Sequence, residues 1–255
     1  MGDEQTPPDH SIPLTGWLLI PLRLVLMVAL LLVCAPLYYL WRLLRLRRFW
    51  PRVFLAGIGV LAGMKVEIVG QHHKDALLLS NHVSWLDILA IARATGTAFV
   101  AHDGLKAIKP LKHLCDMNDT VFIARHDPGS VAEQVEQIRF AIEDTGALTI
   151  FPEGTTDDGT YLLPFKSSLL SAVDPLPEGL FVQPVYLEYA NSQAMAWIGD
   201  EHGARNFFRI VGGWRPVRLR LHFLPVLKGE ALENRKTIAA AAQSAIEGAM
   251  AVAHA

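Results

Sequence analysis

The stretch Ala76-Leu77-Leu78-Leu79-Ser80-Asn81-His82-Val83-Ser84-Trp85-Leu86-Asp87 decides the fold of this chain. Its apolar run predicts a buried strand, and Ser84 followed by Asp87 is a capping-box pattern that predicts a helix starting at Ser84. Asp87 is then expected to face the loop that carries His82. A carboxylate on one imidazole nitrogen leaves the other nitrogen free to take a proton from an alcohol. A plain capping box beside a loop histidine is the alternative interpretation.

A second strand-to-turn junction follows later in the chain, where Leu148–Phe151 runs into Pro152-Glu153-Gly154-Thr155-Thr156. Gly154 permits a tight turn whose backbone N–H groups face one point, which is a common way to hold an anion. Because ligands of open α/β sheets sit outside the carboxyl ends of the strands, this turn is expected on the same side of the sheet as His82. A surface turn that only reverses the chain is the alternative.

Together, N-H-x-S-W-x-D and F-P-E-G-T resemble the signature of the glycerolipid acyltransferase family, lysophosphatidic acid acyltransferase type. Val121-Phe122-Ile123-Ala124-Arg125 resembles that family's second motif, and Val182-Gln183-Pro184-Val185 resembles its fourth. The matches follow the family's order from about Val66 to Tyr189. Four ordered motifs are far more specific than any one of them.

The resemblance implies a membrane-bound O-acyltransferase that moves a fatty acyl group from acyl-CoA or acyl-carrier protein to the hydroxyl of a lysophospholipid. On family prevalence, the first acceptor is 1-acyl-sn-glycerol-3-phosphate, which becomes phosphatidic acid. His82 would be the general base, oriented by Asp87. The residues expected to bind the acceptor's head are Arg125, Glu153, Gly154, Thr155, Thr156 and Lys166. Those expected to brace the His82 loop are Asn81 and Ser84. The thioester is already activated, so no protein nucleophile, metal or cofactor is expected.

Two positions depart from the family's pattern. Thr156 stands where phosphatidic-acid-forming members usually carry arginine, and Ala124 stands where an acidic residue is usual. An arginine fork suits a phosphate, whereas threonine offers only a hydroxyl. The form E-G-T-T-x-D-G, with L-P-F-K-S after it, resembles the branch that acts on lyso-ornithine lipids. This acceptor is the alternative. A non-catalytic membrane lipid-binding protein and a hydrolase are the alternatives of other classes.

The N-terminal part of the chain predicts attachment to a membrane. Residues 1–15 are polar and expected to be disordered, 16–52 form an apolar anchor with a basic flank, and 53–255 form the acyltransferase domain. The apolar run would span the bilayer or lie in one leaflet, with a break at Pro36. Five arginines between Arg42 and Arg52 predict the cytoplasmic side, as in a bacterial inner membrane.

Composition agrees with that location. The mean hydropathy is +0.28, and the net charge of −2 offers no general attraction to nucleic acid. Only two cysteines are present, far apart in the sequence, so a disulfide framework is not indicated.

The hydrophobic pattern predicts an α/β fold, a largely parallel central sheet flanked by helices, with an N-terminal helical membrane anchor. The predicted strands are 66–69, 76–79, 98–101, 120–123, 148–151, 181–187 and 217–223, and the predicted helices are 86–94, 105–114, 131–144, 166–172 and 237–253. The stretches 197–200 and 212–214 are expected to be structural turns rather than parts of an acceptor pocket.

Overall fold

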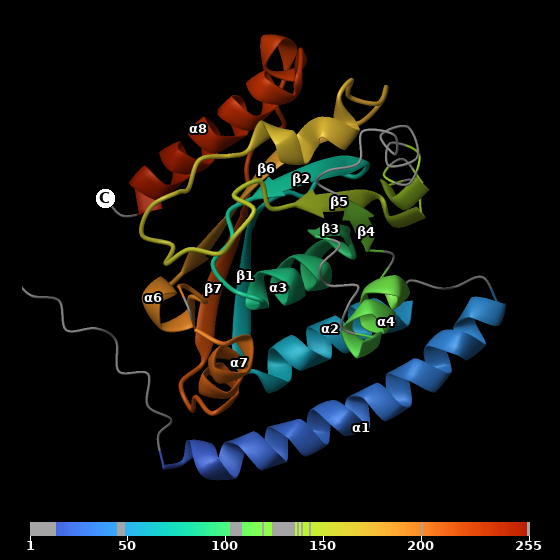
Figure 1. Ribbon diagram of the computed structural model, residues 1–255, viewed down its shortest axis with the longest axis vertical. Coiled ribbons are helices and arrows are strands. Elements are labelled where there is room, and N and C mark those ends of the chain that lie inside the picture. Colours follow the sequence, from blue (N-terminus) through green and yellow to red (C-terminus); the bar gives the residue numbers. More distant parts are fainter. Residues whose placement is uncertain are drawn as a thin grey trace, which may run out of the picture.

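The computed structural model describes residues 14–44, 49–102, 109–118, 120–123, 136, 138, 140–142, 144–199 and 201–253. Within these residues seven strands form one sheet in the order β1-β7-β6-β2-β5-β3-β4 (Figure 1). The strands are β1 Met64–Gly70, β2 Ala76–Ser80, β3 Ala98–His102, β4 Val121–Ile123, β5 Ala147–Ile150, β6 Phe181–Tyr189 and β7 Val217–Phe223. Neighbours pair in parallel except β6 and β7, which confirms the predicted, largely parallel sheet.

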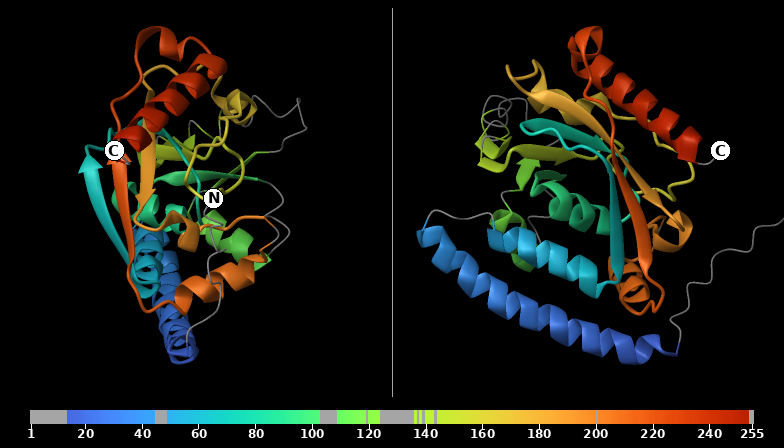
Figure 2. Two further views of the ribbon diagram at one scale, coloured as in Figure 1. Left: turned by 90° about the vertical axis from the view of Figure 1, so that its left-hand side faces the viewer. Right: turned by 180° about the vertical axis from the view of Figure 1, so that it is seen from behind.

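Helices cover both faces of this sheet. They are α1 Gly16–Leu43, α2 Phe49–Leu61, α3 Leu86–Thr95, α4 Lys109–Met117, α6 Ser192–Met195, α7 Gly203–Val211 and α8 Arg235–Ala253, with the 3₁₀ helices η3 Ser167–Val173 and η4 Gly229–Leu232. Figures 1 and 2 show α8 on one side of the sheet and α2 and α3 on the other. Strand β2 is buried throughout, and its alternate side chains enter two cores, Leu78 beneath α3 and Leu77 beneath α8.

Sequence patterns located most of these elements but misjudged several. The predicted helix 166–172 is the 3₁₀ helix η3, and α4 extends to Met117, beyond the predicted end at 114. Residues 103–108, and much of the predicted helix 131–144, lie outside the described residues. The short helices α6 and α7, between β6 and β7, were not predicted. Helix α6 has only four residues, too few to show an apolar period, whereas the apolar face of α7, which includes Ile210 and Val211, was missed.

The N-terminal helix α1 is long and apolar enough to cross a membrane, judged by length and composition. It continues through Pro21 and Pro36, so the break expected at Pro36 does not occur. Figure 2 shows instead a gentle curve, which lets a helix absorb a missing backbone donor. The predicted boundary at residue 52 falls inside α2, a second apolar helix that packs between α1 and α3.

A charged side chain in the N-terminal half of α1 bonds this helix to the rest of the domain. The guanidinium of Arg23 donates to the carbonyl oxygens of Val211 and Gly213, at 2.6 and 2.7 Å. Both carbonyls lie at the C-terminal end of α7, where helix carbonyls lack partners within the helix and favour a cation. This contact holds the N-terminal half of α1 against the sheet domain.

Replacing Arg23 by leucine should therefore loosen this attachment. We expect Arg23→Leu to lower the free energy of unfolding by about 1–2 kcal/mol, since two carbonyls lose a charged donor. Arg42→Leu is the matched control, because Arg42 lies in the same helix and is exposed. Thermal unfolding of the detergent-solubilised protein measures both. Equal losses in the two variants would contradict a specific role of Arg23.

Candidate active site

His82 lies in the loop between β2 and α3, at the carboxyl edge of the sheet. Its Nδ1 is 2.8 Å from Oδ2 of Asp87, so the predicted contact between the two side chains is formed. An ionised carboxylate only accepts hydrogen bonds, so Nδ1 carries the proton and Nε2 keeps its lone pair. The ring stacks on Phe151, with centroids 4.1 Å apart and planes inclined by 16°. The imidazole is thus fixed in tautomer and in orientation.

Asp87 is fully buried and is surrounded by donors. Besides the imidazole, its Oδ2 accepts the backbone N–H groups of Val83 at 2.7 Å and Ser84 at 2.9 Å. Its Oδ1 accepts a hydrogen bond from the hydroxyl of Tyr189, at the end of β6. Burial and the charge of Asp87 raise the pKa of Tyr189 well above its usual value, so this hydroxyl stays a donor. Sequence reasoning missed Tyr189, since nothing in its local pattern marks it.

The capping box at the start of α3 is formed only in half. The carboxylate of Asp87 reaches back to the N–H of Ser84 as predicted, but the helix begins at Leu86. The hydroxyl of Ser84 is buried and makes no hydrogen bond among the described residues. The helix start expected at Ser84 is therefore wrong, because the acid is used to hold the histidine loop.

The turn after β5 holds the backbone of His82 from both sides. Oε1 of Glu153 accepts the N–H of His82 at 2.7 Å, and the N–H of Asp157 donates to the carbonyl of His82 at 2.9 Å. Oε2 of Glu153 accepts from the N–H of Leu163 at 3.1 Å. The expectation that this turn lies beside His82 is therefore confirmed.

The other predicted site residues are placed as follows. Asn81 is buried and exchanges two hydrogen bonds with the backbone of Leu187 on β6, a position from which it braces the loop. Nζ of Lys166 donates to the carbonyl of Glu153 at 2.7 Å. The N–H of Gly154 donates within the turn, to the carbonyl of Phe151. Thr155 is exposed, while Thr156 donates to the carbonyl of Trp197. Arg125 lies outside the described residues.

A cavity of about 470 Å³ opens next to His82 and has mostly apolar walls. One set of lining residues comes from the catalytic loops and the segment after β6, namely His82, Trp85, Phe151, Gly154 and Trp197. Another set comes from α1, α2 and α4, and includes Leu31, Cys34, Phe54, Leu114 and Cys115. The predicted anchor helix therefore also forms a wall of the cavity. Both cysteines are free thiols.

Three carboxyl groups, those of Asp87, Glu153 and Asp157, lie around the loop of His82. Burial raises the pKa of Glu153 to about 7, and the nearby carboxylates of Asp157 and Asp87 add to this shift. The two backbone N–H donors oppose it. Oδ2 of Asp157 is buried and has no hydrogen-bond partner among the described residues. A buried carboxylate oxygen without a donor is costly.

Comparisons with known proteins agree with this arrangement. The model of the family described as Acyltransferase matches residues 65–188. The chain is 34% identical over 218 residues to a lyso-ornithine lipid O-acyltransferase of Rhizobium meliloti (strain 1021), covering 82% of this chain and 72% of that protein. It is 35% identical over 143 residues to a 1-acyl-sn-glycerol-3-phosphate acyltransferase of Neisseria meningitidis serogroup B, covering 52% and 53%.

The crystal structure of the 1-acyl-sn-glycerophosphate acyltransferase PlsC from Thermotoga maritima shares the fold. Its TM-score is 0.57 at 19% identity, over 92% of this chain and 98% of that one. The buried histidine–aspartate pair, the glycine turn beside it and the similarity over most of the chain all lead to one conclusion. The chain belongs to the acyltransferase family and is an acyltransferase.

The raised pKa of Glu153 predicts a pH dependence of stability. The folded protein keeps this carboxyl protonated up to about pH 7, whereas the unfolded chain ionises it near 4.5. Folding therefore takes up a proton between these values, and the free energy of unfolding falls as the pH rises through them. Relative to Glu153→Gln, the wild type should lose on the order of 3 kcal/mol between pH 4.5 and 8.

Chemical unfolding at a series of pH values measures this difference. Any loss of hydrogen bonds in Glu153→Gln is a constant offset, because glutamine does not titrate. Glu178→Gln is the control, since Glu178 is exposed. A pH-independent difference between the wild type and Glu153→Gln would show that Glu153 is ionised throughout.

Proposed function

We propose that this chain transfers a fatty acyl group from a thioester to the hydroxyl of a lysolipid. Nε2 of His82 takes the proton of the acceptor hydroxyl while its oxygen attacks the thioester carbonyl carbon. The thiolate of the donor then leaves and receives that proton from the imidazolium, which Asp87 stabilises meanwhile. The donor is acyl-CoA or acyl-carrier protein. The 2.8 Å pair of His82 and Asp87 at an apolar cavity is the observation that carries this proposal.

The apolar cavity supports a lipid substrate. Its walls include α1, whose opposite face exposes Leu18, Val25 and Leu32, at 79%, 66% and 69%. Such a continuous apolar face is favourable only against a membrane or another apolar surface. We therefore place α1 along the membrane, held to the domain by Arg23, so that a hydrocarbon chain reaches the cavity from the bilayer. We further propose that the active site lies on the cytoplasmic face of a bacterial inner membrane, which the basic flank of the apolar segment supports.

We infer that lyso-ornithine lipid is the acceptor. Its head carries an amine and a carboxylate rather than a phosphate. The side chains of Asp87 and Asp157 near His82 favour an amine over a phosphate, and Oδ2 of Asp157 has no hydrogen-bond partner among the described residues, which suits an ammonium group. The relative with the lyso-ornithine name matches over 82% of this chain, whereas the Neisseria relative matches over 52%. These observations reverse the order of the two acceptors expected from family prevalence.

Lysophosphatidic acid is the second candidate. Lys166 is a cation placed on the turn, and Arg125 would supply another for a phosphate. A hydrolase would use water in place of the lysolipid. Release of free fatty acid from acyl-CoA without acceptor would identify that activity. A non-catalytic lipid-binding role would leave the ordered pair of His82 and Asp87 without a purpose.

The general base is tested by His82→Ala. We expect a loss of about 10²–10⁴-fold in turnover, with the fold and membrane attachment retained. The matched control is His222→Ala, because His222 also pairs with a carboxylate, Glu188 at 2.7 Å, and does not line the cavity. Transfer of radiolabelled acyl groups measures both variants. Near-normal turnover of His82→Ala would show that another group takes the proton.

The acceptor is tested by the lipids formed from a panel of lysolipids. Asp157→Asn should raise the KM for lyso-ornithine lipid by about 10- to 100-fold, since a charge-assisted bond to the amine is lost. Activity on lysophosphatidic acid should not fall. Asp158→Asn is the control, because Asp158 bonds within its own turn to Thr160. A wild type active on lysophosphatidic acid alone would rule out the proposed acceptor.

A further inference from the structure

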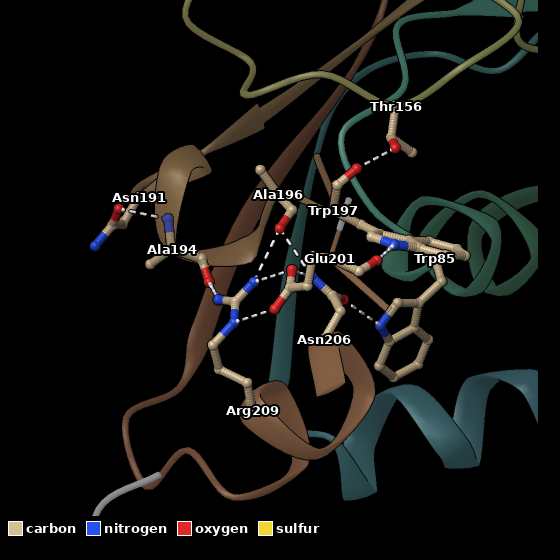
Figure 3. Close-up of polar contacts among 9 residues, drawn as sticks. All are labelled: Trp85, Thr156, Asn191, Ala194, Ala196, Trp197, Glu201, Asn206 and Arg209. Atoms are coloured by element: carbon tan, nitrogen blue, oxygen red, sulfur yellow. Dashed lines mark hydrogen bonds and ion pairs between the residues drawn. The ribbon is translucent and has the colours of Figure 1, made fainter. Parts of the chain in front are cut away.

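The segment between β6 and β7 contains a buried polar cluster that lies beside the catalytic loop (Figure 3). Asn206, on α7, is fully buried and donates to the carbonyl of Ala196 at 2.8 Å and to Glu201 at 2.9 Å. Its side-chain oxygen accepts from the indole N–H of Trp85 at 3.1 Å. Trp85 lies within the histidine motif, so this cluster contacts the catalytic loop directly.

An ion pair completes the cluster. Arg209 lies 3.1 Å from Glu201, with side chains only 9% and 13% exposed. The guanidinium also donates to the carbonyl of Ala196 at 2.9 Å and to that of Ala194. A buried ion pair adds little net stability compared with apolar side chains of the same shape, but it demands one geometry. The cluster therefore holds residues 194–199 and 201–209 in one defined arrangement.

Trp197 links this unit to both catalytic motifs. Its N–H donates to the carbonyl of Val83 at 3.0 Å, and its carbonyl accepts the hydroxyl of Thr156 (Figure 3). Its indole N–H donates to the carbonyl of Glu201 at 2.7 Å. The ring packs so closely over Gly203 that a Cβ there would lie 2.8 Å from it. Trp197 also lines the cavity together with His82, so this residue, expected to lie in a structural turn only, belongs to the pocket.

We propose that Thr156 is a positioning residue, which holds the carbonyl of Trp197 and thereby seats the Trp197 ring as the wall of the acceptor's site. The O–H of Thr156 is already donated in this contact, so we assign the hydroxyl to positioning Trp197 rather than to reading the acceptor's head group. The wall belongs to the acceptor side because it adjoins the polar turn of Glu153 and Asp157, whereas α1 and α2 line the apolar part. This role rests on the proposed function for the identity of the acceptor.

Two substitutions at one position separate the hydroxyl from the shape of the side chain. Thr156→Val removes the hydroxyl, and Thr156→Ser keeps it. We expect Thr156→Val to raise the KM for the lysolipid about 3- to 10-fold, with the KM for the acyl donor unchanged. Thr156→Ser should stay within about twofold of the wild type. Thr160→Val is the matched control, because the hydroxyl of Thr160 bonds to Asp158 in its own turn.

A double substitution tests whether Thr156 acts through Trp197. On a Trp197→Ala background, Thr156→Val should change the acceptor KM by less than about twofold, because the ring that it positions is gone. Thr156→Arg should weaken every acceptor alike. Three results would each overturn the proposal. The KM effects of Thr156→Val and Trp197→Ala could multiply in full in the double variant, or Thr156→Val and Thr156→Ser could raise the acceptor KM equally. Thr156→Arg could also improve activity on an acceptor that carries a phosphate. Thermal unfolding shows that each variant is folded.

These measurements use both lyso-ornithine lipid and lysophosphatidic acid. A wild type that takes only lysophosphatidic acid would refute the proposed acceptor, and the effects of the Thr156 substitutions are then read with that lipid. The choice of acceptor by the wild type therefore tests the proposed function, whereas the KM effects of the Thr156 substitutions test the positioning role.

Discussion

The carboxylate of Asp87 is buried in the first turn of α3, where an ionised group survives only if donors surround it. Four donors do so, three from the loop of residues 82–84 and one from Tyr189 on β6. The four hydrogen bonds form together only if α3, the loop and the end of β6 are placed correctly relative to one another. The N-terminal end of a helix also favours a negative charge. His82 receives its orientation as a consequence of this one satisfied charge.

The register of the sheet also fixes the position of the glycine turn relative to the loop of His82. Leu79 of β2 pairs with Ile150 of β5, so the two strands end at the same level. The turn after β5 then meets the loop after β2, and Glu153 and Asp157 bond to opposite sides of the backbone of His82. The acid of the glycine turn thus shapes the histidine loop. The expectation from sequence was that it would contact the acceptor, and that role stays a prediction.

Beside the apolar cavity lies the turn that carries Glu153 and Asp157, and each of these two regions is contacted by a segment without a recognised motif. Helix α1 supplies walls such as Leu31 and Cys34 while exposing its other face, so in the proposed function one helix both lies against the membrane and lines the lipid's cavity. The segment after β6 supplies Trp197 on the polar side, supported by the buried pair of Arg209 and Glu201. A lipid substrate has the same two parts, a hydrocarbon chain and a polar head.

The sequence by itself determined the α/β sheet, the long apolar N-terminal helix and the contact of His82 with Asp87, because strand and helix periods and a five-residue spacing are local properties of the chain. The sequence placed the glycine turn correctly beside the histidine, because parallel strands end at one edge. Only the tertiary structure decided the roles of Tyr189, 102 residues from Asp87, and of Trp197, 41 residues from Thr156. Their contacts depend on how β6 and α7 pack against the loop. Contacts between residues so far apart in the chain produce no periodic pattern or fixed spacing in the sequence.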